Sequence, residues 1–142
     1  MRAGSDPIGF AWRGDVSDDE LVALTRSHGG NPEPGSWDRV RKHSLGWVSA
    51  RLEDGRLVGF VNVAWDGGDH AFLLDTKVDP DFQRRGIGTE LVRLAALHAK
   101  GAGCEWLEVD FDDTDRLAAF YFEACGFRPT NAGLLHLPDF GS

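Results

Sequence analysis

A turn between a strand and a helix, at residues 79–89, most constrains what this chain can fold into. The run "HAFLLDTKV" (70–78) has the composition of a strand, and Asp79-Pro80 ends it because a residue before proline avoids the helical conformation. A helix follows from about Gly88 to Lys100. Its buried side consists of apolar residues at helical spacing, which are Ile87, Leu91, Leu94 and Ala95. A strand that runs directly into an amphipathic helix indicates an α/β fold.

The N-terminal part predicts one strand and two helices. The strand covers residues 9–14. Ser17 and Glu20 fit the capping box that begins a helix, and Gly29-Gly30 ends that helix. Residues 37–44 predict a short second helix with a thin apolar face.

Three strands in a row then predict an antiparallel meander. They cover residues 45–52, 57–65 and 70–78. Asp54-Gly55 is a strong hairpin signal between the first two, and the turn "DGGD" (66–69) separates the second from the third.

The C-terminal part predicts a strand at 104–111, a helix at 115–125 and closing β segments at 127–129 and 133–137. The order β-α-α-β-β-β-α-β-α-β-β describes one α/β domain over residues 1–142. Its sheet is mixed, partly antiparallel and partly joined by crossovers, with helices flanking it.

Composition excludes several classes of protein. The chain has 142 residues and a formal net charge of −8, which argues against a nucleic-acid partner and favours cationic small molecules or basic peptides. No stretch is long and apolar enough to cross a membrane, and the first thirty residues do not resemble a signal peptide, so we expect a soluble cytoplasmic protein. Cys104 and Cys125 lack metal spacing and are expected to be small buried hydrophobes, and the five histidines predict no metal site.

The turn itself has the chemistry of an anion site. Around Gly86 and Gly88 the first helical N–H groups have no intrahelical partner, and the missing side chains let a ligand approach the backbone. Arg84 and Arg85 add positive charge. Phosphate or pyrophosphate is the expected ligand. A dinucleotide fingerprint would need glycine in place of Leu91, and a P-loop would need a G-K-[S/T] sequence that the chain lacks.

The turn resembles the [Q/R]-x-x-G-x-[G/A] motif of the GNAT superfamily of N-acetyltransferases. Gln83 to Gly88 carry this motif, "VDPDF" (78–82) precedes it, and "FYFEACGF" (120–127) is similar to the family's downstream Y-x-x-x-G-F. The resemblance is convincing over Leu73 to Phe127.

The resemblance implies a GNAT-like acyl-CoA N-acyltransferase fold with acetyl-CoA bound in a cleft between two splayed strands. It assigns the pantetheine arm to backbone groups of Thr76, Lys77 and Val78. It assigns the pyrophosphate to a longer run, which is Gln83, Arg84, Arg85, Gly86, Ile87, Gly88 and Thr89. Thr114 is also placed at the cofactor, although many relatives have asparagine there. Its hydroxyl can cap a helix but lacks the second function of a carboxamide.

The resemblance also suggests catalytic residues. Tyr121, the one tyrosine, stands where the family often has the phenol that protonates the departing thiolate. Glu108 resembles the glutamate base of ribosomal-protein-alanine acetyltransferases, although the loop before Tyr121 is one residue longer here. Asp75 and Asp110 are the alternatives. Strand alternation places Glu108 and Asp110 on one face and Leu107 and Val109 on the other.

The sequence says less about the acceptor amine than about the cofactor. A cluster of acids near the expected acceptor side would attract a cationic amine, and it consists of Glu105, Glu108, Asp110, Asp112, Asp113 and Asp115. Trp12 and Trp37 either pack in the core or line the acceptor pocket. We predict direct transfer of an acetyl group to a primary amine in a ternary complex, without a metal. A small amine, an antibiotic and a peptide N-terminus all stay open as the acceptor. A CoA-binding module without turnover is the alternative, and a homodimer stays open.

Overall fold

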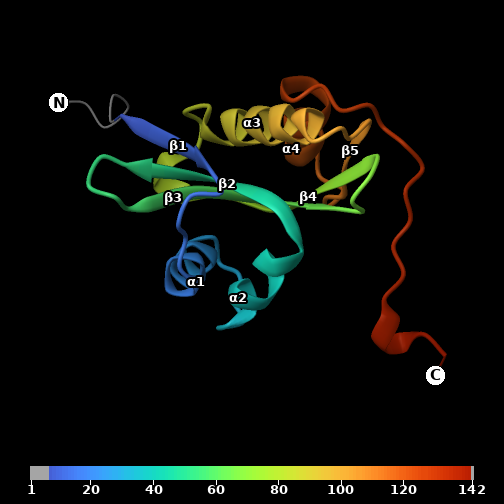
Figure 1. Ribbon diagram of the computed structural model, residues 1–142, viewed down its shortest axis with the longest axis horizontal. Coiled ribbons are helices and arrows are strands. Elements are labelled where there is room, and N and C mark those ends of the chain that lie inside the picture. The colour runs from blue at the N-terminus through green and yellow to red at the C-terminus, as the bar shows by residue number, and fades with distance from the viewer. Residues whose placement is uncertain (1–6, 142) are drawn as a thin grey trace. The chain divides into compact units, whose positions relative to one another are not determined.

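Five strands form one mixed sheet in the order β1-β2-β3-β4-β5, as shown in a computed structural model that describes residues 7–141 (Figure 1). The first four strands pair antiparallel, and β5 pairs parallel with β4. The strand bounds are β1 Ile8–Trp12, β2 Ser44–Leu52, β3 Leu57–Trp65, β4 His70–Val78 and β5 Trp106–Val109. The predicted mixed sheet and its antiparallel meander are thereby confirmed.

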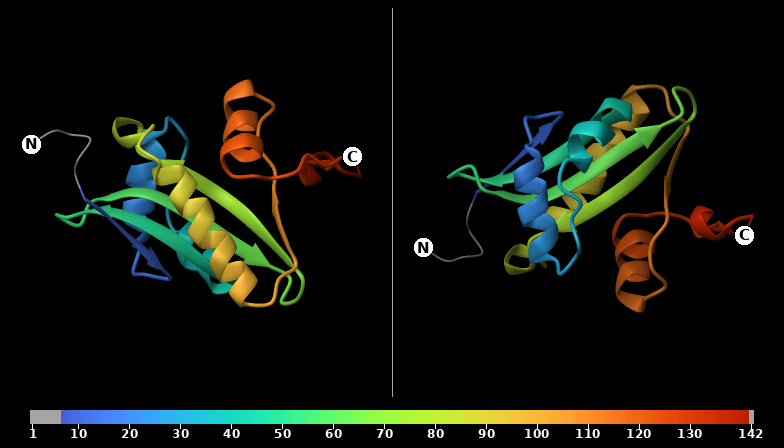
Figure 2. Two further views of the ribbon diagram at one scale, coloured as in Figure 1. Left: turned by 90° about the horizontal axis from the view of Figure 1, so that it is seen from above. Right: turned by 90° about the horizontal axis from the view of Figure 1, so that it is seen from below.

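The described chain divides into two compact units, one ending at Val109 and the other beginning at Asp110. The prediction of a single domain over 1–142 stays a prediction. In the first unit, α3 (Ile87–Gly101) runs across one face of the sheet, whereas α1 (Asp18–Ser27) and α2 (Ser36–Val40) lie on the other face (Figures 1 and 2). Helices on both faces bury both sides of β2 and β3.

Aromatic side chains fill the core beneath α1 and α2. The Trp37 ring meets the rings of Trp47 and Phe60 edge to face, at centroid distances of 5.0 and 5.1 Å. Leu21 and Leu24 of α1 complete this cluster. Each indole N–H finds a backbone acceptor, since Trp37 donates to Val16 and Trp47 to Gly14. Trp37 is therefore a core residue, as one of its two interpretations predicted.

On the opposite face of the sheet, a glycine on β3 lets α3 lie close to the strands. A Cβ atom at Gly59 would lie 3.0 Å from Ile87 and 3.2 Å from Leu91, so the small residue on β3 sets how close α3 can lie. Trp12 stacks on His98 of α3 with centroids 4.3 Å apart. The predicted buried side of this helix is confirmed, because Ile87, Leu91 and Ala95 are buried and Leu94 is partly buried.

The start of α1 follows the sequence signal. The Ser17 hydroxyl accepts from the Glu20 amide at 3.1 Å, and the Glu20 carboxylate accepts from the Ser17 amide at 3.0 Å. Arg51 of β2 also donates to Glu20, and this bond lowers the pKa of Glu20 to about 2. Glu20 therefore both starts α1, as part of the capping box, and links α1 to β2 through Arg51.

The second unit contains a short helix, α4 (Asp115–Ala118), that continues as a π-helical turn over Ala119–Ala124. Tyr121 is buried and its ring stacks on Phe111, with centroids 4.7 Å apart. The rings of Phe120 and Phe127 also meet the Tyr121 ring, edge to face. The helix predicted at 115–125 is thus present, with its second half widened.

Three details of the prediction are wrong. The closing strands at 127–129 and 133–137 do not form, and within residues 110–141 only a 3₁₀ turn at Leu137–Asp139 follows the helical segment. A strand needs a neighbour for its backbone groups, and local sequence does not supply one. The helix predicted at 37–44 is present, as α2 to Val40 followed by a 3₁₀ turn at Arg41–His43. The strand predicted at 104–111 covers only Trp106–Val109, and both cysteines are partly exposed rather than buried.

Candidate functional site

The two halves of β4 have different neighbours. Residues His70 to Leu73 pair with β3 on one side and with β5 on the other. The parallel pairing ends at Leu73, which is opposite Val109. In the unit that ends at Val109, the second half of β4, Leu74 to Val78, therefore pairs with β3 alone and has a free edge.

A bulge interrupts the free half. Leu74 is opposite Asn62 and Lys77 is opposite Phe60, so β4 has one more residue than β3 between these pairs. Asp75 adopts a left-handed conformation with φ 59°. Because Asn62 and Phe60 lie on one face of β3, the bulge places Leu74 and Lys77 on the same face as well. This is the face that α1 and α2 cover.

The backbone of Val78 is directed toward the free edge and meets a histidine. The next amide, that of Asp79, donates inward to Val58 of β3 at 2.8 Å. The Nε2 atom of His28 lies 2.6 Å from the Val78 carbonyl oxygen and 3.1 Å from its amide nitrogen. Sequence analysis predicted a ligand at these groups and missed His28, since nothing in its position after α1 indicated a contact 50 residues away.

The Lys77 side chain points from β4 to α1. Its Nζ donates to the Thr25 hydroxyl at 2.6 Å. Burial lowers the pKa of Lys77 below that of a free lysine, and nearby Asp75 opposes this shift. Sequence analysis considered only the backbone of Lys77, because the resemblance gives its side chain no role.

The turn after β4 is held by a buried carboxylate. Asp79 accepts from the Arg56 guanidinium at 2.7 Å and from the Asp81 amide at 2.9 Å. The ring of Phe82, which is buried, faces Arg56 at 5.5 Å and Arg85 at 4.8 Å. These contacts fix the chain just before the glycine-rich motif.

The motif ends at the N-terminus of α3. Arg84 and Gly86 both have left-handed conformations, with φ 64° and 79°, and Gly86 is the N-cap residue. No side chain in the described part of the chain caps the N-cap residue, which leaves the first N–H groups of the helix for a ligand. Arg84, Gly86 and Thr89 are exposed, whereas Ile87 anchors the helix in the core. The arrangement has the bare backbone, positive dipole and nearby arginines of an anion site.

A pocket of about 320 Å³ lies between α1, α2 and the free half of β4. Its apolar walls include Leu21, Val22, Trp37 and Phe60. Its polar lining includes Asp18, Thr25, Glu33, Asp75 and Lys77. Trp37 belongs to the core and also lines this pocket, whereas Trp12 packs on α3. That the pocket receives the acceptor stays a prediction.

Glu108 lies on β5 beside the paired half of β4. Its Oε2 is 2.8 Å from Nδ1 of His70, and this contact raises the pKa of His70. Trp106 and Glu108 are exposed, and Leu107 and Val109 are less so, which confirms the predicted alternation. His70 was missed by sequence analysis, because only the pairing of two distant strands brings it to Glu108.

The remaining predicted residues lie in the second unit. Tyr121 is buried among aromatic rings within that unit. The Thr114 hydroxyl accepts from the Leu117 amide at 3.2 Å, so it caps α4 as its residue type predicted. Asp110, Asp112, Asp113 and Asp115 are exposed. The roles of Tyr121 and Thr114 toward a ligand stay predictions.

The strand, bulge and glycine-capped helix lie inside a match to a known family. Residues 13–127 match the Acetyltransferase (GNAT) family. The chain belongs to this family. The match begins just after β1 and ends after the helical segment of the second unit, so it covers most of both units.

Two curated relatives show the range of the GNAT family. The chain is 30% identical to a mycothiol acetyltransferase of Propionibacterium freudenreichii over 84% of its own length and 43% of that protein. It is 32% identical to a streptothricin acetyltransferase of Streptomyces lavendulae over 83% of its own length and 65% of that protein. The chain therefore spans less than two thirds of either relative.

Solved structures of the GNAT fold superpose on the chain. A GNAT family acetyltransferase of Streptococcus pneumoniae TIGR4 matches with a TM-score of 0.77 and 23% identity, over 92% of this chain and 98% of that one. An aminoglycoside N-acetyltransferase in complex with CoA matches with a TM-score of 0.74 and 17% identity, over 96% and 97%. At such identities these structures establish the fold.

Residues 7–141 contain no helix that is long and apolar enough to span a membrane. Within the same residues, no group of three or more His, Cys, Asp or Glu side chains is arranged to hold a metal ion.

Proposed function

We propose that this GNAT protein is an acetyl-CoA-dependent N-acetyltransferase that acts on a primary amine by direct attack in a ternary complex. One observation carries the proposal, namely that the free half of β4 runs directly into the uncapped N-terminus of α3. A free strand edge can pair with the amide groups of a pantetheine arm, and a helix N-terminus binds pyrophosphate. The two sites follow each other along one segment of chain.

The cofactor would use the predicted residues in order. The pantetheine arm would pair with the backbone of Thr76, Lys77 and Val78, and the pyrophosphate with residues 83–89. His28 must leave the Val78 backbone for this pairing to form, because both would use the same amide and carbonyl groups. Thr114 is proposed as a further cofactor contact.

The chemistry needs a base, and Glu108 is the proposed one. An ammonium must lose a proton before it attacks the thioester. The bond to His70 orients the Glu108 carboxylate, so the two residues act as a pair. Asp75, at the bulge and lining the pocket, is the alternative. Tyr121 is proposed to protonate the departing thiolate.

A covalent cysteine intermediate is disfavoured. Burial raises the pKa of both Cys104 and Cys125, and the acids Asp66 and Asp69 raise that of Cys104 further. A thiol with a raised pKa forms less of the reactive thiolate at neutral pH. Direct transfer needs no such nucleophile, so it fits the residues better.

Binding and turnover are tested separately. Acetyl-CoA should raise the melting temperature more than NAD or ATP does, and release of free thiol with a panel of primary amines should measure transfer. Equal stabilisation by all three ligands would contradict the cofactor assignment. Binding without thiol release from any amine would favour a CoA-binding module without turnover.

A single substitution tests Tyr121. Tyr121→Phe removes the hydroxyl and keeps the ring that packs on Phe111, so we expect turnover to fall by roughly ten- to a hundredfold with acetyl-CoA affinity nearly unchanged. Phe120→Leu, a change in a neighbouring ring, is the control for packing. An unchanged turnover in Tyr121→Phe would make this residue structural.

A further inference from the structure

The pocket between α1, α2 and β4 contains a lysine, Lys77, that forms no salt bridge with the described residues. Within residues 7–141, no carboxylate oxygen lies within 4.0 Å of the Lys77 ammonium. It donates instead to a neutral group, the hydroxyl of Thr25, at 2.6 Å. An ammonium has three donors, so the hydroxyl leaves two of them for other acceptors.

The surroundings of Lys77 favour the binding of an anion to its ammonium group. The side chain is partly buried, and burial lowers the pKa of Lys77. Leu21, Trp37 and Phe60 form apolar walls of the same pocket. A cation that is partly removed from water is stabilised most by an anion brought to it, because the attraction is stronger where water is excluded.

The acids of the pocket are not equivalent. Both oxygens of Asp18 accept from backbone amides, those of Gly35 at 2.7 Å and Trp37 at 3.3 Å, so Asp18 holds the start of α2. Glu33 is exposed and lies 3.9 Å from Arg39. Asp75 shares β4 with Lys77, two residues away, and lines the same pocket. One cation and one anion thus occupy neighbouring positions on the strand proposed to hold the acetyl donor.

We infer that the acceptor is an amine that also carries a carboxylate, with Lys77 binding the carboxylate and Asp75 adjoining the ammonium. The inference rests on the proposed function and narrows its acceptor class to amino acids and similar zwitterions. Lys77 is a specificity-determining residue in this assignment. Purely cationic amines such as polyamines would bring a like charge to Lys77 and are expected to be poor acceptors.

The experiment compares acceptors that differ only in the carboxylate. Free α-amino acids are assayed with acetyl-CoA beside their α-carboxamides, and kcat/KM is measured for each pair. A charge-assisted hydrogen bond to Lys77 should favour the acids by roughly ten- to a hundredfold. Lys77→Met should bring the acid-to-amide ratio close to one, and Lys77→Arg should keep part of it. A change in acetyl-CoA binding would alter kcat/KM equally for the acid and the amide, so it does not affect the acid-to-amide ratio.

Thr25→Val is the matched control. It removes the hydroxyl that holds Lys77 but keeps the positive charge, so the acids should remain favoured. Amides that react as well as acids in the parent protein would overturn the inference. An acid-to-amide ratio that is unchanged in Lys77→Met would also overturn the inference.

Binding separates this inference from the proposed function. Calorimetry with CoA present measures the affinity of each acid and amide without any turnover. If acids bind more tightly in a Lys77-dependent way but no thiol is released, the pocket assignment holds and the enzymatic proposal fails. If amides turn over and acids neither bind better nor react faster, the enzyme stands and the acceptor assignment fails. If neither acids nor amides bind, the acceptor assignment fails as well.

Discussion

The two halves of β4 differ in what their residues do, although they belong to one strand of nine residues. From His70 to Leu73 the strand has neighbours on both sides, and its buried side chains hold the sheet to α3. Within the unit that ends at Val109, the strand from Leu74 to Val78 has one neighbour, a bulge and a free edge. The first half shows what stabilises the fold, and the second shows where backbone groups are left for a ligand.

The largest contrast is expected between Gly86 and a glycine in an ordinary turn. Gly86→Val puts a β-branched residue at φ 79° and crowds the N-terminus of α3, so acetyl-CoA binding should be lost, with a stability cost of about 1–2 kcal/mol. Titration calorimetry measures the affinity.

Gly55→Val is the control, because Gly55 has φ 96° in the hairpin before β3. It should cost similar stability and leave acetyl-CoA affinity unchanged. If the Gly86 variant binds normally, the pyrophosphate site lies elsewhere. Arg84→Ala should only weaken binding.

Two adjacent leucines test the division of β4 directly. Leu73 is 3% exposed and Leu74 is 45% exposed. Leu73→Ala leaves a cavity against α3 and should lower the free energy of unfolding by about 2–4 kcal/mol. Leu74→Ala should cost about 0.5 kcal/mol or less. Urea denaturation gives both values, and equal losses would mean that the free half contributes as much to the core as the paired half.

The prediction from sequence succeeded where local signals are strong. The Ser17–Glu20 capping box, the Asp54-Gly55 hairpin and the buried side of α3 each follow from a few neighbouring residues. The glycine-rich motif located the N-terminus of α3 within one residue.

It failed where residues far apart in the chain decide the result. His28 reaches Val78, and His70 reaches Glu108, only after the sheet has formed. The closing strands were predicted from composition, but Leu134 and Leu135 are exposed and have no strand partner within residues 110–141. The bulge at Asp75 also has no local sequence signal, since its one extra residue is defined only against β3.

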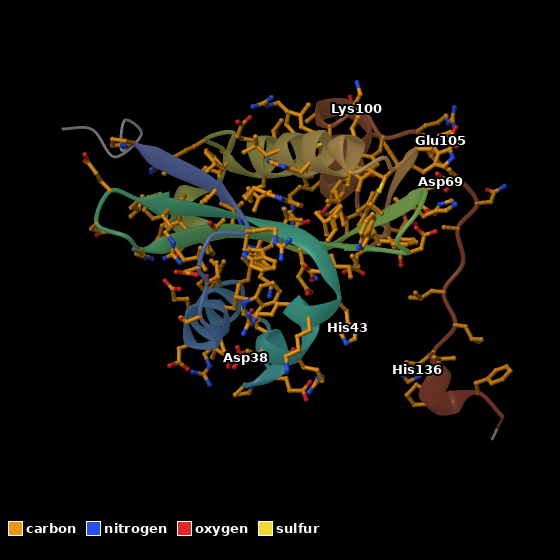
Figure 3. All side chains as sticks on the ribbon, in the orientation of Figure 1. Asp38, His43, Asp69, Lys100, Glu105 and His136 are labelled. Atoms are coloured by element: carbon orange, nitrogen blue, oxygen red, sulfur yellow. The ribbon has the colours of Figure 1, made fainter. Side chains whose placement is uncertain are left out.

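The start of β4, where His70 meets Glu108, offers a test of how stability depends on pH. Asp69 and Glu105, labelled in Figure 3, mark where β4 and β5 begin, and the Glu105 amide donates to the Asp69 carbonyl at 2.9 Å. Nearby, Glu108 raises the pKa of His70 above 6.5. The pair therefore stabilises the fold fully below pH 6.5, and this contribution is lost as the pH rises through the raised pKa of His70.

Glu108→Gln should return the pKa of His70 toward 6.5, which NMR titration of the imidazole measures. If Glu108 is the base, the same change should flatten the rising limb of the pH–rate profile. His136→Gln is a control, because its partner Asp139 lies in the other unit and the variant should leave His70 unchanged. An unshifted His70 would show that the contact does not persist in solution.

The smallest expected effect concerns the free half itself. His28 contacts the same Val78 groups that the proposed pantetheine pairing needs, so bound cofactor must displace the imidazole. The Gln83 side chain also donates to the Val78 carbonyl, at 3.2 Å, and is the same in both proteins compared. His28→Ala removes this competitor, and acetyl-CoA should bind a few-fold more tightly, on the order of 1 kcal/mol for one neutral bond. His43→Ala is the matched control, since His43 points outward from the turn after α2 (Figure 3). Weaker binding in His28→Ala would mean that the imidazole supports the cofactor rather than competing with it, and that the residue after α1 completes the edge of β4.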